Sequence, residues 1–200
     1  DAMHVELMLS RDGLRWERPF RNQPFIASGD QAFSNGGIFT NATPVFLEDE
    51  IRFYYGGYNS GAIGGGAKVT DPSQHSGVGF ASVSRDRFAG IRPVAISAQS
   101  TLKRPLEHLG QITLTPLDLH NVQQISLNAD ASRGTVRVEI LTADGYRMRG
   151  FSRDDATPLT GDSLTHHVTW QDHSLADLPA GTYSLRLHLD NAEVFAITLK

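Results

Sequence analysis

Residues 36–59 decide the fold, and their sequence is GGIFTNATPVFLEDEIRFYYGGYN. Two runs rich in β-branched and aromatic residues stand on either side of the acidic segment Glu48-Asp49-Glu50. Such a pattern predicts an antiparallel hairpin with a solvated turn. From Gly56 to Gly66 the chain is mostly Gly, Tyr, Asn and Ser, which predicts a flexible loop rather than a strand. Loops at hairpin ends commonly carry ligand contacts.

Composition excludes several classes of function. The chain has 200 residues, of which 40% are hydrophobic, enough for one large or two small domains. Its net charge of −4 provides no basic surface for nucleic acid, and no apolar run approaches the ~18 to 20 residues that a membrane helix needs. Cysteine is absent, which rules out disulfides, iron–sulfur clusters and thiolate zinc sites. We therefore expect no cofactor, no nucleic acid partner and no membrane partner.

An internal repeat predicts the architecture of the first half. Ser10–Pro19 aligns without gaps on Ser84–Pro93, at a constant offset of 84 − 10 = 74 positions. Each segment follows a β-rich run, so the unit is a strand followed by a polar turn, as in a propeller blade with long loops. Asp12 and Asp86 are expected to bond backbone N–H groups within these turns, and Trp16 to fill the gap between neighbouring blades.

The repeat covers only part of a propeller. One complete blade extends from about Gly36 to Ile91, and Val5–Pro19 forms the end of the blade before it. One blade and a fragment cannot close a ring, so we expect the other blades in a missing N-terminal segment or a partner chain. The strand-like start at Val5 favours a processed or truncated chain; the alternative is a mature N-terminus that adds an edge strand.

The second half changes in character after an irregular stretch. We assign residues 1–98 to the blade segment, 99–109 to a linker and 110–200 to an antiparallel β-sandwich. Val136, Val138 and Ile140 alternate with Arg137 and Glu139, which predicts one buried and one polar face. Strands are expected at 112–119, 122–128, 135–141, 166–170, 182–189 and 194–199. Trp170 is expected to fill the sandwich core or its interface with the propeller.

These features resemble the five-bladed β-propeller glycosidases, and most closely the glycoside hydrolase family 32 group of β-fructosidases and levanases or an uncharacterised bacterial relative of them. The resemblance rests on the turn Ser10–Trp16, the hairpin end Arg52–Gly57 and the strand Gly77–Ala81. It implies that the chain is the C-terminal part of such a protein, an all-β partial propeller followed by a β-sandwich. It also implies a secreted or periplasmic location.

The resemblance does not extend to the catalytic residues. Members of that group use an Asp of an Arg-Asp-Pro motif, whereas Arg11-Asp12 and Arg85-Asp86 lack the following proline. A retaining glycosidase needs two carboxyl groups about 5 Å apart, and the sequence offers no convincing pair. We therefore predict no catalytic residue in this chain, and place the catalytic carboxylates outside it.

Six residues are predicted to contact a carbohydrate. Tyr55, Tyr58 and Asn59 supply the aromatic faces and amide that sugars use, although tyrosines in hairpins usually pack across strands. Asn35 and Asn41 flank the strand expected to lie innermost in the blade; the alternative is capping of turns or strand ends. His75 lies in the long loop, where the alternative is a solvated side chain.

No metal site is predicted. His166 and His167 are adjacent on an expected strand, so they point to opposite faces and cannot chelate one ion together.

The sequence leaves two hypotheses for the function of this chain. One is a carbohydrate-active enzyme of the propeller type, to which this chain contributes pocket residues. The alternative is a non-catalytic carbohydrate-binding or assembly module.

Overall fold

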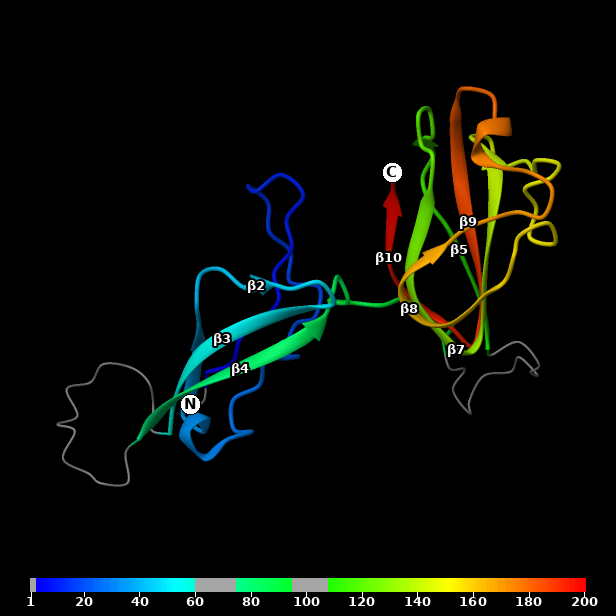
Figure 1. The fold of residues 1–200 in the computed structure, drawn as a ribbon. Helices are drawn as coiled ribbons and strands as arrows, with labels where there is room; N and C mark the ends of the chain where they lie inside the picture. The colour runs from blue at the N-terminus through cyan, green and yellow to red at the C-terminus, as the bar shows by residue number, and fades with distance from the viewer. Residues whose placement is uncertain (1–2, 60–74, 95–107) are drawn as a thin grey trace, which may run out of the picture. The chain divides into compact units, whose positions relative to one another are not determined.

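The computed structural model describes residues 3–59, 75–94 and 108–200 (Figure 1). The chain is all-β in these ranges, with two antiparallel sheets and two short 3-10 helices, which confirms the all-β part of the predicted fold class. It divides into two compact units, Asp1–Arg85 and Asp86–Lys200. Most of the expected linker, residues 99–107, lies outside the described residues. Residues 86–94 belong to the second unit: Ile91 and Val194 exchange backbone hydrogen bonds of 2.9 and 3.0 Å.

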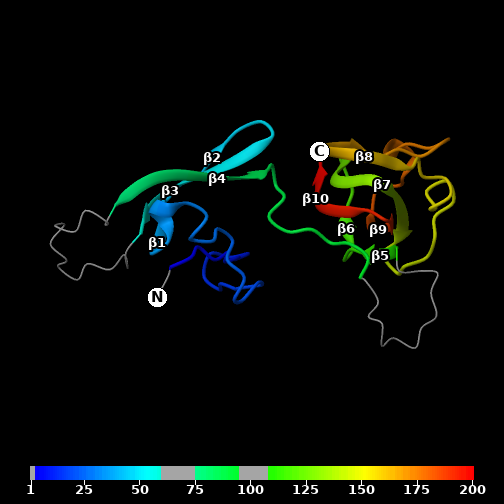
Figure 2. The same cartoon turned by 90° about the horizontal axis from the view of Figure 1, so that it is seen from below.

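The first unit contains one sheet centred on β3. Its strands are β1 (Gly37–Thr40), β2 (Val45–Phe46), β3 (Glu50–Tyr58) and β4 (Ser76–Ser84). Strand β3 pairs along its whole length with β4, and on its other edge with β2 at its start and β1 at its end (Figures 1 and 2). Leu47 N–H donates to the Glu50 carbonyl at 2.9 Å, so β2 and β3 form the predicted hairpin.

The glycines after Tyr55 are part of β3, which corrects the expectation that a loop begins at Gly56. Gly57 faces Gly77 across the ladder, and the ring of Phe33, from the 3-10 helix η1 (Ala32–Ser34), lies over both. A Cβ at Gly57 would lie 2.8 Å from that ring, and one at Gly77 would lie 2.7 Å away. Glycine is required here because an aromatic ring occupies the space of a side chain.

The second unit contains a six-stranded sheet. Its strands are β5 (Leu109–Thr113), β6 (Leu117–Asp118), β7 (Ile125–Thr142), β8 (Leu159–His167), β9 (Thr182–Asp190) and β10 (Glu193–Leu199). The first half of β7 pairs with β8 and β10, and its second half pairs with β9, which in turn pairs with β5 and β6. Figure 2 shows the curvature of β7 that this change of partner requires.

Two strands expected at 122–128 and 135–141 are therefore one. The chain passes through Arg133-Gly134, where a turn was predicted, without leaving the strand. The carbonyl of Asp190 approaches Gly134 so closely that no Cβ could be accommodated. Gly134 thus allows close contact between β7 and the end of β9 rather than a reversal of the chain.

The core of the second unit follows the predicted alternation. Val136, Val138 and Ile140 are buried on one face of β7, and Tyr183, Leu185, Leu187 and Leu189 of β9 are buried beside them. Trp170 is also buried here, and its indole N–H donates to the Val138 carbonyl at 3.0 Å. Phe151 meets the Trp170 ring edge to face at 5.2 Å. The expectation that Trp170 fills a core is confirmed.

A second 3-10 helix, η2 (Leu175–Asp177), lies between β8 and β9 in the chain.

The two repeated turns differ in conformation. In the first, Asp12 Oδ1 accepts hydrogen bonds of 2.8 Å from the N–H groups of Leu14 and Arg15, and Gly13 has a φ of +73°. In the second, Asp86 itself has a positive φ of +59°. Trp16 is 57% exposed and donates to the Gly13 carbonyl at 3.2 Å, so in this chain it does not fill a gap.

Candidate functional site

The base of the glycine-rich loop is closed by Asn59 and His75. Asn59 N–H donates to the His75 carbonyl at 3.2 Å, which adds one rung beyond the end of the β3–β4 ladder. The Asn59 carbonyl oxygen, Oδ1, accepts from the His75 backbone N–H at 2.9 Å, and the two side chains meet at 3.0 Å between Nδ2 and Nδ1. The sequence suggested both residues separately, and the structure brings them together. Residues 60–74 of the loop lie outside the described residues.

Tyr55 and Tyr58 point to opposite faces of β3, because they are three positions apart in a strand. Tyr55 is buried, stacks on Phe33 with the ring centroids 6.4 Å apart, and lies over its cross-strand partner Gly79. Tyr55 thus packs across the strands, which was the alternative to a role in sugar binding. Tyr58 is 44% exposed and meets Phe39 edge to face at 6.0 Å. Tyr58 lies at the same end of the sheet as Asn59 and His75, but by the same alternation the Asn59 side chain points to the face that carries Tyr55.

The face that carries Tyr58 is open and aromatic. We call it the outer aromatic face; its side chains are Phe39, Tyr54, Tyr58, Val78 and Phe80, and each is at least 36% exposed. Tyr54 and Phe80 are direct cross-strand partners, with centroids 5.8 Å apart. Phe39 and Val78 both pair with Gly56, which has no side chain and leaves a gap between them.

The opposite face of this sheet is covered. Ile51, Ile38 and Tyr55 are buried, and Ile26 from the N-terminal segment packs with the last two. Phe25 contacts Phe53 edge to face at 5.2 Å on this side. One face of the sheet thus has a core of its own, whereas the outer aromatic face has none within the described residues of the first unit.

Asn35 and Asn41 occupy positions that match their alternative, structural interpretation. Asn35 is the C-terminal cap of η1 and is exposed, with its side-chain carbonyl directed toward Gly29. Asn41 follows the last residue of β1, and its backbone N–H donates to the Tyr54 carbonyl at 3.0 Å. Neither side chain is placed beside Tyr58 by any contact in the described residues, so their role in ligand binding stays a prediction.

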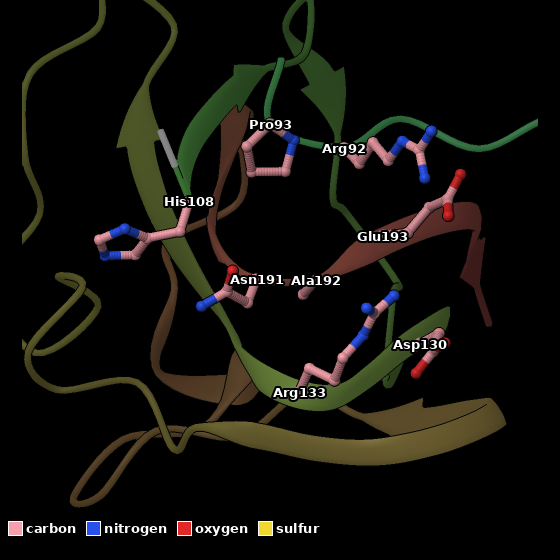
Figure 3. A pocket seen from close by; sticks show the side chains of 8 residues that line it. All are labelled: Arg92, Pro93, His108, Asp130, Arg133, Asn191, Ala192 and Glu193. Carbon is pink, nitrogen blue, oxygen red and sulfur yellow. The ribbon is translucent and has the colours of Figure 1, made fainter. Parts of the chain in front are cut away.

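A pocket of about 200 Å³ lies in the second unit (Figure 3). It is formed by the segment before β5, the curved part of β7 and the turn between β9 and β10. Figure 3 shows Arg92 and Glu193 extending on one side and His108 and Asn191 on the other. The complete lining is Arg92, Pro93, His108, Asp130, Arg133, Asn191, Ala192 and Glu193.

Local hydrogen bonds lower the pKa of one carboxyl group in this pocket, that of Asp130. The side chain and backbone N–H of Ser132 bond to Asp130 and hold the pKa of its carboxyl below the ordinary value of 3.8, with a smaller contribution from the charges of Arg87 and Arg133. The pocket thus offers anionic acceptors and guanidinium donors, a combination that suits a hydroxyl-rich ligand. The sequence analysis missed this site. The sequence signal for it was weak: Arg133 precedes Gly134, and Asp190 precedes Asn191, two positions that read as turns.

The described residues hold no group of three or more His, Asp or Glu side chains that could bind a metal ion. Within the same ranges, no helix has the length and apolarity needed to cross a membrane. Comparison of the chain with protein-family models, with curated proteins and with solved structures finds no match. The functional interpretation therefore rests on the geometry of the chain itself.

Proposed function

We propose that this chain is the C-terminal portion of a carbohydrate-active, glycoside hydrolase-like protein. In this proposal the first unit is one blade of a β-propeller and the second unit is a β-sandwich. Tyr58, Asn59 and His75 contribute to the substrate pocket, and the catalytic carboxylates lie outside the chain. A completing segment or partner chain supplies the other blades.

The outer aromatic face is the observation that carries this proposal. Aromatic side chains bury about 150–250 Å² each, so four that are roughly half exposed present about 300–500 Å² of apolar surface. The largest apolar patch of a typical soluble monomer measures about 300–600 Å² and is often functional, so this face is a candidate for an interaction site. A propeller blade packs on a neighbour through each face of its sheet, and here only one face is covered. A missing neighbour accounts for the other.

The residues near the loop base fit the sugar contacts that the proposal requires. Tyr58 presents an exposed ring at the end of the β3–β4 ladder, and the Asn59 amide and His75 imidazole meet each other one rung beyond it. Aromatic rings pack against the apolar face of a sugar, while amides and imidazoles bond its hydroxyl groups. Tyr55 has a packing role, which leaves Tyr58 as the tyrosine of this site.

Hydrolysis assays test the proposal directly. The chain alone and the protein from the complete reading frame would be assayed on fructans, arabinans and aryl glycosides. We expect turnover only by the complete protein, and a higher KM when Tyr58 is changed to Ala. The matched control is Tyr146→Phe, an exposed tyrosine in the second unit. Turnover by the chain alone would contradict the placement of the carboxylates, and no turnover by either protein would contradict the enzyme.

The alternative is a non-catalytic carbohydrate-binding or assembly module, which the same aromatic face also favours. Glycan-array binding without hydrolysis by the complete protein would support this alternative. The mass of the protein in solution distinguishes carbohydrate binding from assembly. If a folded monomer of 21.9 kDa binds the glycan, the outer aromatic face is a sugar-binding surface. Association with a partner chain that covers Phe80 supports assembly.

A further inference from the structure

The second unit carries a second pocket that shares no lining residue with the pocket of Figure 3. Its volume is about 290 Å³, near the lower end of the range for small-ligand pockets. The lining residues are Leu109, Gly110, Gln111, Thr135, Arg137, Arg153, His188, Leu189 and Asp190. All of them belong to the second unit, so the site does not depend on the first.

The strand register explains why these residues meet. Arg137 of β7 pairs with His188 of β9, which pairs with Gln111 of β5, so the three side chains form one row across the sheet. Thr135, Asp190 and Leu109 form the next row in the same way. The two rows lie on the face opposite the core residues Val136 and Val138. Strands fix these positions more rigidly than loops would.

A buried carboxylate orients His188. Glu139 is 0% exposed, although its side chain alternates with the core residues of β7. Its Oε2 lies 2.9 Å from His188 Nε2 and 3.8 Å from Arg186 Nη1. Its Oε1 lies 3.2 Å from Arg147 Nε but makes no hydrogen bond in the described structure. Because Nε2 is engaged by Glu139, the Nδ1 atom of the same ring is the one available to the pocket.

Arg137 is also held in place. Its Nη1 donates to the carbonyls of Ala156 and Arg153, at 2.6 and 3.4 Å, and this links β7 to the loop that carries Arg153. The Arg153 side chain is exposed at the rim and makes no hydrogen bond within the described residues. Two guanidinium groups therefore border one pocket.

The charge of the lining matches a monoanion. Arg137 and Arg153 contribute +2 and Asp190 contributes −1, so these three side chains sum to 2 − 1 = +1. Asp190 is partly satisfied already, since Asn191 Nδ2 donates to its Oδ1 at 3.3 Å and His108 Nε2 lies 3.7 Å away. Guanidinium groups bind planar carboxylates with two parallel hydrogen bonds. His188 Nδ1 and the Gln111 amide can bond hydroxyl groups beside that carboxylate.

We propose that this pocket binds a small hydroxylated carboxylate through Arg137, Arg153 and His188, with Glu139 as the positioning residue for His188. Two sources share this chemistry: the uronic acid unit of an acidic carbohydrate, and a small free hydroxy acid. Leu109 adds an apolar edge that would contact the C–H face of a sugar ring. The inference stands on the second unit alone, so it can fail without affecting the proposed function, and the reverse also holds.

Titration of the complete 200-residue chain with D-glucuronate, D-glucose and D-glycerate, followed by the NMR signals of His188 and of the β9 amides, tests this proposal. We expect glucuronate to bind at millimolar concentration or below, and glucose to bind at least about tenfold more weakly, a difference of about 1.4 kcal/mol. Glycerate separates the two sources. If it binds as well as glucuronate, a small hydroxy acid is the ligand, and if it binds about tenfold more weakly, the ligand is an acidic sugar.

Two arginine variants give a matched pair. Arg153→Gln removes a charge from the pocket rim, whereas Arg149→Gln removes one from an exposed position of the neighbouring loop outside the lining. We expect the first to weaken glucuronate binding at least about tenfold and the second to change it less than about twofold, because one charge-assisted pair is lost only in the first. Glu139→Gln should shift the His188 ring signals before ligand is added. Equal effects of the two arginine variants, equal binding of glucose, or no binding at millimolar concentration would each overturn the proposal.

Discussion

The ring of Phe33 over Gly57 predicts opposite effects for two neighbouring glycines of β3. A Cβ at Gly57 would lie 2.8 Å from Phe33 and 2.9 Å from Ser34 Cβ, whereas one at Gly56 would meet nothing within 4 Å. Overpacking lowers the free energy of unfolding by about 1–3 kcal/mol. Replacing Gly by Ala raises it by about 0.4–1 kcal/mol, because the unfolded chain has less conformational entropy. At mid-range values we expect Gly57→Ala to destabilise the first unit by about 1.3 kcal/mol (2 − 0.7), and Gly56→Ala to stabilise it slightly.

Amide hydrogen exchange of the β3–β4 ladder measures this difference, because it reports the opening free energy of the first unit separately from the second. A Phe33→Leu background supplies the control: with a smaller side chain over the ladder, the penalty of Gly57→Ala should shrink, and the double-mutant cycle measures the coupling. The reasoning is refuted if Gly57→Ala is neutral or stabilising, or if both glycine variants change the exchange rates in the same direction.

Three further perturbations have expected outcomes. Ile140→Ala should destabilise the second unit by about 2–5 kcal/mol in urea unfolding, because the side chain is fully buried; a cost below that range would contradict the described core. Ser152→Ala should raise the pKa of Asp155 toward 3.8 in an NMR titration, since hydrogen bonds from the Ser152 side chain and backbone lower it. Because that folded-state pKa is depressed, the associated stability is present above pH 3.8 and is lost as the pH falls through the folded value. Trp16→Ala should change stability by less than about 0.5 kcal/mol, since the ring is exposed; a larger loss would mean that Trp16 is packed.

Side-chain alternation made much of the second unit predictable. Val136, Val138 and Ile140 are buried as their spacing indicates, because strand geometry alone decides which face each one occupies. The number of strands was not predictable in the same way. Arg133-Gly134 has the composition of a turn, but the glycine serves a close approach of the Asp190 carbonyl, and only the three-dimensional contact distinguishes the two uses.

The internal repeat shows that similar sequences can adopt different local conformations. Ser10–Pro19 and Ser84–Pro93 match in sequence, yet the first turn has its left-handed residue at Gly13 and the second at Asp86. Arg87 occupies the position that corresponds to Gly13, and its side chain instead pairs with Asp162 and donates to Asn128 at 2.8 Å. Aligned residues can therefore belong to different local structures when one partner is held by distant contacts.

The candidate site was predictable in its residues but not in their grouping. Tyr58, Asn59 and His75 could each be selected from the sequence as residue types that suit a sugar. The contact between Asn59 and His75 depends on the exact register of β3 and β4, which places these two residues opposite each other. Tyr55 and Tyr58 lie on opposite faces because the strand continues through Gly56 and Gly57, and the Phe33 ring packs over Gly57.

Burial of Glu139 leads to a final prediction, which separates a structural carboxylate from a surface ion pair. Glu139 is fully buried and meets His188, Arg186 and Arg147, whereas the Arg147 side chain is 76% exposed. Glu139→Gln keeps one acceptor oxygen but removes the negative charge and turns the other oxygen into an NH2 donor that faces arginine or histidine donors, so it should cost about 1–3 kcal/mol. Arg147→Gln should cost no more than about 1 kcal/mol, since an exposed partner of an ion pair is readily replaced by water. Urea unfolding of the two variants measures the difference. If the arginine variant loses as much stability as the glutamate variant, Arg147 is the main partner of the carboxylate, and the assignment of Glu139 as the residue that orients His188 is wrong.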